Sequence, residues 1–314
     1  AARRVSLVYG KPSYPELGVR VLLLGVLILD TQPLTVGLAE TLGKSNTTIG
    51  RIYNTVYQRC RQQRQLIIDN FPKLNRFLTG YDLRHVFNDE MTEFDLTRIL
   101  TGSEGTLAFI TEARLDITRL PKVRRLVNVK YDSFDSALRN APFMVEARAL
   151  SVETVDSKVL NLAREDIVWH SVSELITDVP DKEMLGLNIV EFAGDDEALI
   201  DERVNALCVR LDELIASQQA GVIGWQVCRE LAGVERIYAM RKKAVGLLGN
   251  AKGAAKPIPF AEDTCVPPVH LADYIAEFRA LLDSHGLSYG MFGHVDAGVL
   301  HVRPALDMCD PQQE

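Results

Sequence analysis

The chain has 314 residues, of which 47% are hydrophobic and 25% charged, and its formal net charge is −7. This is ordinary globular composition, and the length allows two domains. The acidic balance excludes nucleic acid as the expected partner, because a DNA- or RNA-binding protein needs a basic face.

The first third of the chain predicts a small sheet followed by helices. Apolar runs at Val19–Leu24 and Val26–Leu29 flank Gly25 and predict a fully buried β-hairpin. The run is far shorter than the roughly 18 residues that a membrane span needs, so we expect no transmembrane segment. No cleavage site follows it, so we expect no signal peptide. A short helix should follow Pro33.

A longer helix is expected to open near Ser45–Asn46 and to run to about Asn70, before Pro72. Its apolar positions recur at helical spacing, which predicts a buried stripe made of Ile49, Ile52, Val56 and Cys60. The arginines of this helix are expected on its solvated face: Arg59, Arg61 and Arg64.

The sequence GSEGT, residues 102–106, separates a short predicted helix, Asp95–Leu100, from an alternating strand over residues 107–117. Because glycine has no Cβ, the backbone of such a turn can approach a phosphate or the edge of a flavin closely. The alternative is an ordinary tight turn with Glu104 in water. From the residues alone, the ordinary turn is favoured.

From about Leu126 onward strands alternate with helices, after a basic stretch at Lys122–Arg125 that we interpret as a domain crossing. We therefore expect two domains, residues 1–120 and 121–314. The second is predicted to be an α+β unit with its helices on one face of a mostly antiparallel sheet. Its expected strands are 126–131, 187–192, 222–228 and 257–265, and its expected helices are 133–140, 195–217, 235–248 and 271–285. A further strand-and-helix pair is expected within 147–163, and strands after 286.

Near the C-terminus, GHVDAGVLHVRP (residues 293–304) carries His294 and His301. Neutral imidazoles are common metal ligands, and the two rings can converge if the segment bends or crosses a strand pair. Two histidines do not complete a metal site, so structural histidines remain the alternative. The other four histidines, His85, His170, His270 and His285, are expected at helix ends or on the surface.

Three stretches together resemble one family. LTGSEGTLAFITEARL (100–115) is similar to the segment that closes the FAD domain of vanillyl-alcohol oxidase/PCMH-type flavoproteins. EDTCVPPVHLADYIAEF (262–278) and YGMFGHVDAGVLHV (289–302) resemble the FAD-linked oxidase C-terminal domain. The resemblance implies an α+β protein: the second half of a PCMH-type FAD-binding domain, then a ferredoxin-like cap. The similarity is strongest to the large D-2-hydroxyglutarate dehydrogenase-like subgroup with an appended iron–sulfur region.

The resemblance also implies roles for individual residues. His294 and His301 would bind a divalent metal, usually zinc, and Arg241 a substrate carboxylate. Arg303 stands where the family has asparagine, and a second cation there suits a dicarboxylate. The residues implied to contact FAD are Gly102, Ser103, Glu104, Gly105, Thr106 and Ile110. Two departures from the family pattern, Ala297 and Val299, replace an aspartate and an asparagine.

The family's pyrophosphate-binding loops are expected before residue 1. Its general base and third metal ligand are expected beyond Glu314, and its iron–sulfur motifs later still. The chain is thus expected to be an internal, inactive piece of a cytoplasmic enzyme, either free or peripheral to the inner membrane. That enzyme would oxidise D-2-hydroxyglutarate, with the substrate between the two domains and an unspecified electron acceptor. The alternatives are D-lactate or glycolate as substrate, or a cofactor-free structural module.

Overall fold

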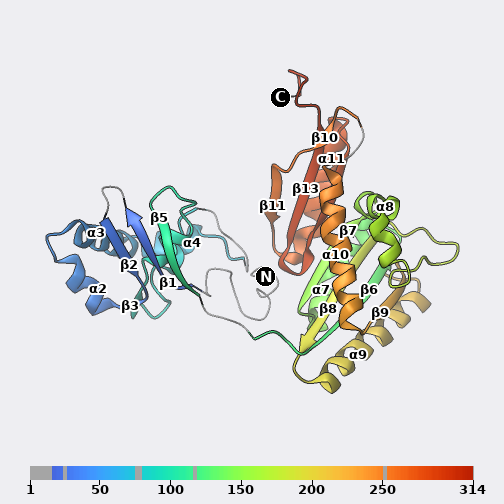
Figure 1. Ribbon diagram of the computed structural model, residues 1–314, viewed down its shortest axis with the longest axis horizontal. Coiled ribbons are helices and arrows are strands. Elements are labelled where there is room, and N and C mark those ends of the chain that lie inside the picture. The colour runs from blue at the N-terminus through green and yellow to red at the C-terminus, as the bar shows by residue number, and fades with distance from the viewer. Residues whose placement is uncertain (1–15, 24–26, 75–79, 116–118, 250–252, 314) are drawn as a thin grey trace. The chain divides into compact units, whose positions relative to one another are not determined.

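The computed structural model describes residues 16–23, 27–74, 80–115, 119–249 and 253–313. The chain divides into two compact units, Ala1–Arg119 and Leu120–Glu314. Figure 1 shows the three-stranded sheet of the N-terminal unit and the larger sheet of the C-terminal unit. Helices and strands are both abundant, so the α+β prediction is confirmed. Among the described helices, none is long and apolar enough to cross a membrane.

The N-terminal unit contains an antiparallel sheet in the order β2-β1-β5. Its strands are β1 (Glu16–Leu23), β2 (Leu27–Thr31) and β5 (Phe109–Leu115). The expected hairpin is present, although the residues around Gly25 lie outside the described ranges. The prediction that it is fully buried is wrong, because side chains alternate between two faces.

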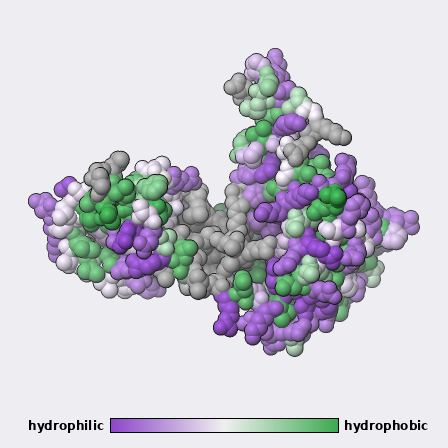
Figure 2. All heavy atoms as spheres, viewed as in Figure 1, coloured by the Kyte–Doolittle hydropathy of each residue, from purple (hydrophilic) through white to green (hydrophobic). Residues whose placement is uncertain are grey.

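One face of this sheet is buried and the other is not. Val19, Val21 and Leu29 are buried, whereas Ile28 and Phe109 are 59% and 72% exposed. Hydrophobic and hydrophilic residues accordingly share the visible surface of the N-terminal unit in Figure 2. The apolar runs therefore make a sheet with one core face rather than two.

Helices cover the core face. They are α2 (Val36–Gly43), α3 (Thr48–Gln62), α4 (Arg64–Asn70) and α5 (Thr97–Thr101), with a 3-10 turn, η2 (Leu83–His85), and two short strands, β3 (Leu34–Thr35) and β4 (Glu93–Phe94). The prediction of one helix up to Asn70 is wrong, because the helix breaks at Gln63, whose backbone leaves the helical region. Thr47 caps α3 by accepting a hydrogen bond from Gly50 N.

The buried side of α3 differs from the predicted stripe. Tyr53, Tyr57 and Cys60 are buried, while the other predicted positions are only partly so: Ile49, Ile52 and Val56. The ring of Tyr57 packs edge-on against Phe87 at 5.2 Å between centroids. Aromatic rings bury more area than aliphatic side chains, and this cluster sets which side of the helix faces inward.

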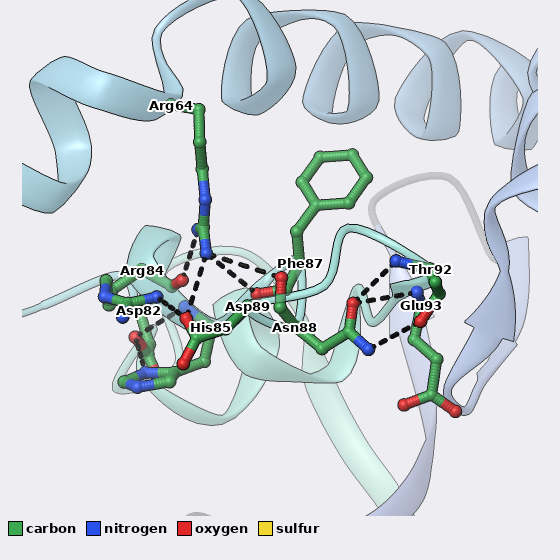
Figure 3. Close-up of polar contacts among 9 residues, drawn as sticks. All are labelled: Arg64, Asp82, Arg84, His85, Phe87, Asn88, Asp89, Thr92 and Glu93. Carbon is green, nitrogen blue, oxygen red and sulfur yellow. Dashed lines mark hydrogen bonds and ion pairs between the residues drawn. The ribbon is translucent and has the colours of Figure 1, made fainter.

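Arg64 does not lie on the solvated face, so that prediction is wrong, although Arg59 and Arg61 are exposed. Figure 3 shows the guanidinium of Arg64 pointing at the loop that follows η2. Arg64 Nη1 donates to the carbonyl of Arg84 at 2.6 Å, and Arg84 in turn pairs with Asp89 at 2.8 Å. The arginine satisfies loop carbonyls that would otherwise lack donors.

The C-terminal unit contains an eight-stranded sheet whose pairings are all antiparallel among the described residues. Its central strands are β6 (Val123–Tyr131), β7 (Ser151–Asp156), β8 (Gly186–Gly194) and β9 (Val222–Cys228). They lie in the order β7-β8-β6-β9, and along the chain they follow β-α-β-β-α-β with one further helix, α8 (Ser157–Glu165), inserted between β7 and β8. This is the ferredoxin-like topology that the resemblance implied.

Helices cover both faces of this sheet, so the expectation of one covered face is wrong. One core cluster contains α6 (Phe134–Arg139), α7 (Ala141–Glu146), α9 (Glu197–Ala216) and α11 (Leu271–Ser284). The opposite cluster contains α8 (Ser157–Glu165) and α10 (Leu231–Leu248). The reason lies in the strands: consecutive residues of β6, such as Leu126 and Val127, are both fully buried.

The sheet is extended beyond β7 by β12 (Tyr289–His294) and β13 (Val299–Leu306). Both β10 (Lys256–Pro257) and β11 (Ala261–Cys265) pair with β13. The single strand predicted over 257–265 is thus two short ones. The 3-10 turns are η3 (Ile167–Ser171), η4 (Pro268–His270) and η5 (Val295–Ala297).

Two smaller features complete the unit. Gly298 has φ +67, and a Cβ there would come within 1.7 Å of Val266 O, so only glycine fits this turn between β12 and β13.

The other four histidines lie at or next to helix ends, as predicted, in η2, η3, η4 and at the C-cap of α11: His85, His170, His270 and His285.

Candidate active site

The two predicted histidines lie on neighbouring strands of one sheet face. His294 stands directly opposite Glu153 of β7, and His301 opposite Phe292 of β12. Paired residues of neighbouring strands point to the same face, here the face covered by α10. The turn around Gly298 thus brings the two imidazoles to a centroid separation of 5.7 Å.

Three residues form what we call the Glu153 group: Arg241, Glu153 and His294. His294 Nδ1 lies 3.0 Å from Glu153 Oε1, and Arg241 Nη2 lies 2.5 Å from Glu153 Oε2. The Glu153 side chain is only 5% exposed. Arg241 comes from α10, so one buried carboxylate joins a helix to two strands. This arrangement neutralises a buried negative charge with a guanidinium.

A second, similar set forms the Glu262 group: Arg303, Glu262 and His301. Arg303 Nε hydrogen-bonds to Glu262 Oε1, and Arg303 Nη1 donates to Val245 O at 3.3 Å. His301 Nδ1 is 3.9 Å from Glu262 Oε2, which is an ion-pair distance and too long for a hydrogen bond. Glu262 is 24% exposed, so this group is closer to solvent.

Phe292 lies between the two groups. The guanidinium carbons of Arg241 and Arg303 are 5.4 and 5.2 Å from the centre of its ring. The His301 ring is 4.9 Å away at an angle of 30°. Cation–π attraction stabilises guanidinium groups over an aromatic face. The site therefore gathers two guanidinium groups and two imidazoles around one phenyl ring.

The histidines fit part of a metal site. In the Glu153 group, a proton on His294 Nδ1 would be donated to the glutamate and leave Nε2 as the ligand atom, the usual arrangement for a metal-bound histidine. Within the described ranges, however, no cluster of three or more His, Cys, Asp or Glu residues could hold a metal. These residues can supply two ligands, and a zinc site needs more.

The GSEGT turn lies in the N-terminal unit, between α5 and β5. Glu104 and Gly105 both have positive φ, 48° and 81°. Ser103 N and Thr106 N donate to Leu100 O and Ser103 O, so these two amides hold the turn itself. Among the described residues, the amides of Glu104 and Gly105 donate to no backbone carbonyl. Two of the turn's amides thus fit an anion or flavin edge.

Packing explains the first glycine of this turn. A Cβ on Gly102 would come within 2.5 Å of Gly80 O, so the glycine is needed for close backbone contact. Ser103 is buried and its hydroxyl donates to Leu100 O. Ile110, also implied to contact FAD, is 45% exposed. The exposed members of this set are the ones that can meet a cofactor.

Sequence reasoning missed Glu153 and Glu262. Glu153 lies in SVETVD, a strand in which every residue is buried, and a lone glutamate there is itself a signal of a special role. Its partner His294 is 141 residues away, so the pairing could not be read locally.

Asp156, at the end of the same strand, is also a buried acid. It accepts hydrogen bonds from Val159 N and Met291 N, and so caps α8 and ties it to β12. Burial raises the pKa of Asp156 from 3.8 to about 6, against the opposing effect of these two N–H donors.

Comparison with known proteins identifies the family of the chain. The chain belongs to the family described as FAD linked oxidases, C-terminal domain, which matches residues 120–314. It is 94% identical over its whole length to the D-2-hydroxyglutarate dehydrogenase of Escherichia coli K12, and 47% identical to that of Pseudomonas putida. In both cases the chain spans 31% of the relative's length.

A more distant relative and two solved structures match as well. The glycolate oxidase subunit GlcD of Bacillus subtilis is 23% identical over 68% of the chain and 41% of that protein. p-Cresol methylhydroxylase matches with a TM-score of 0.54 at 13% identity, over 96% of the chain and 53% of the other. The 4-ethylphenol oxidase of Gulosibacter chungangensis gives 0.52 at 12%, over 96% and 53%. At such identities these structures establish the fold alone.

Proposed function

We propose that the chain is part of an FAD-dependent dehydrogenase that oxidises a D-2-hydroxy acid, most specifically D-2-hydroxyglutarate. The observation that carries the proposal is the gathering of Arg241, Arg303, His294 and His301 on one sheet face. Guanidinium groups bind carboxylates in a forked geometry, and a metal between imidazoles binds a hydroxyl and a carboxylate together. Four relatives at 47–94% identity carry the name D-2-hydroxyglutarate dehydrogenase.

In this proposal the chain's own residues bind and orient the substrate. Arg241 holds the carboxylate next to C2, since its Nε has no hydrogen-bond partner among the described residues and remains available as a donor. His294 and His301 would supply two ligands to a divalent metal, zinc as the first candidate, which would act as a Lewis acid on the substrate. FAD would supply the acceptor for the hydride at C2, and a base elsewhere in the complete protein would take the hydroxyl proton.

The remaining expectations belong to the same proposal. The amides of Glu104 and Gly105 contact the flavin edge, together with Ile110. The electrons then pass to iron–sulfur centres or another acceptor elsewhere in the complete protein. A cytoplasmic location is part of the same proposal, as the family resemblance implies.

One observation favours a monocarboxylate, D-lactate or glycolate, as the second candidate. Glu262 already neutralises Arg303, so this second cation is not free to meet a distal carboxylate unless the pair opens. A relative named as a glycolate oxidase subunit supports the same alternative.

The experiment compares substrates in the complete natural protein that contains this sequence. We expect bound flavin by absorbance, bound zinc by elemental analysis, and a higher kcat/KM for D-2-hydroxyglutarate than for D-lactate or glycolate. Arg303→Ala should raise KM for D-2-hydroxyglutarate and leave KM for D-lactate unchanged. A colourless protein without activity on any of the three acids would contradict the proposal, and a preference for D-lactate or glycolate would select the second candidate.

A further inference from the structure

In the Glu153 group, a single buried carboxylate lies against both His294, a predicted metal ligand, and Arg241, the arginine predicted to bind the substrate carboxylate. Its two oxygens are divided between them: Oε1 meets His294 Nδ1 at 3.0 Å, and Oε2 meets Arg241 Nη2 at 2.5 Å. Neither contact is a surface pair, since the glutamate is 5% exposed and His294 9%. The geometry can therefore hold two functional side chains in fixed positions.

We infer that Glu153 is a positioning residue that aligns the metal-binding imidazole with the carboxylate-binding guanidinium. The inference rests on the proposed function of the same site. By accepting a hydrogen bond at Nδ1, Glu153 selects the tautomer in which Nε2 of His294 carries the lone pair. By pairing with Arg241, Glu153 also fixes the position of the Arg241 guanidinium relative to the sheet.

Glu262 does not duplicate this role. Its contact with His301 is 3.9 Å, too long to select a tautomer through a hydrogen bond. Its side chain instead accepts a hydrogen bond from Arg303 Nε. The two glutamates thus differ in a measurable way: removal of Glu153 should affect both metal and substrate, whereas removal of Glu262 should affect substrate more than metal.

The same sheet offers a matched control. Glu191 of β8 is 1% exposed and holds Arg124 at 2.7 Å and the hydroxyl of Tyr238 at 2.5 Å. Its carboxylate accepts hydrogen bonds from Arg124, Ser151 and Tyr238, none of which belongs to the Glu153 group. Glu191→Gln therefore reports the general cost of losing a buried carboxylate in this sheet.

The test uses the complete natural protein with Glu153→Gln, Glu153→Ala and the control Glu191→Gln. Co²⁺ affinity is measured from the d–d absorption of the metal-free protein titrated with Co²⁺, and KM and kcat are measured with D-2-hydroxyglutarate. Glu153→Ala should lose about 10- to 100-fold in Co²⁺ affinity, the usual effect of removing a group that orients a metal ligand. Glu153→Gln keeps an oxygen for His294 and loses the charge facing Arg241, so it should raise KM with a smaller loss of Co²⁺ affinity.

Glu191→Gln should lower the melting temperature and leave Co²⁺ affinity and KM unchanged. The inference is overturned if Glu153→Gln behaves like Glu191→Gln in Co²⁺ affinity and KM, a result that stands even if Glu153→Ala fails to fold. If wild type itself binds no Co²⁺ and oxidises no 2-hydroxy acid, the proposed function fails first. If wild type does both and the Glu153 variants are unaffected, only the positioning role fails.

Discussion

The Glu153 and Glu262 groups contain the same three residue types, but they differ in burial and in the distance between the glutamate and the histidine. Glu153 is 5% exposed and touches both of its partners, whereas Glu262 is 24% exposed and stands 3.9 Å from its histidine. Charges held in a low-dielectric interior interact more strongly and rearrange less than charges near water. The first group is therefore preorganised, and the second can open when a ligand arrives.

This difference separates two tasks of binding. A fixed guanidinium and imidazole suit the end of the substrate that reacts, where small displacements reduce the rate strongly. A guanidinium whose glutamate partner can be displaced suits the end that only distinguishes one acid from another.

The largest expected effect is on stability. Arg241→Met leaves Glu153 as a buried, uncompensated carboxylate and should lower the free energy of unfolding by about 3–5 kcal/mol. Arg303→Met should cost only about 1–2 kcal/mol, because the partly exposed Glu262 keeps some solvation. Urea unfolding followed by tryptophan fluorescence checks this, since Trp169 and Trp225 both lie in the C-terminal unit. Equal losses for the two variants would remove the distinction between the groups.

A second expected effect concerns pH and the strand that carries Glu153. Because burial raises the pKa of Asp156 from 3.8 to about 6, the folded protein retains a proton between about pH 4 and 6 that the unfolded chain has lost. The retained proton stabilises the folded protein, and its contribution to the free energy of unfolding is complete below about pH 4. It falls by about 3 kcal/mol as the pH rises to 6. The Asp156→Asn variant should lack this dependence, measured by urea unfolding across pH 4 to 7. A stability difference between wild type and variant that is independent of pH would refute the assignment.

The smallest expected effect is on selectivity. Glu262→Gln removes the charge that neutralises Arg303, so the guanidinium can meet a distal carboxylate without breaking an ion pair. KM for D-2-hydroxyglutarate should fall by about 5-fold, the effect of an ion pair that remains partly exposed to solvent, while KM for D-lactate stays constant. Steady-state kinetics with both acids measure this. A parallel change in both KM values would show that Glu262 acts on something other than the distal carboxylate.

The sequence could predict the parts of the fold that depend on local patterns. The strands and helices of the C-terminal unit follow its apolar periodicity, and the histidines follow their spacing around an obligatory Gly298. The break at Gln63 was missed, because no proline or glycine stands there. The inward turn of Arg64 was missed, because its carbonyl partners lie about 20 residues downstream.

The candidate site likewise depends on contacts between residues that are far apart in the sequence. Arg241 was implied only by resemblance, and its pairing with Glu153 spans 88 residues and depends on how α10 crosses the sheet. Glu153 pairs with Arg241 and Glu262 pairs with Arg303, and no local sequence motif identifies either glutamate. A buried glutamate in SVETVD indicates that a partner must exist, but only the strand register identifies it as His294.

The most direct test of the central claim is a crystal structure of the complete protein with zinc and D-2-hydroxyglutarate, with anomalous data collected at the zinc edge. The account predicts an anomalous peak within bonding distance of both His294 and His301, with the C2 carboxylate of the substrate on Arg241. A ligand bound elsewhere, with no metal between the two histidines, would contradict it.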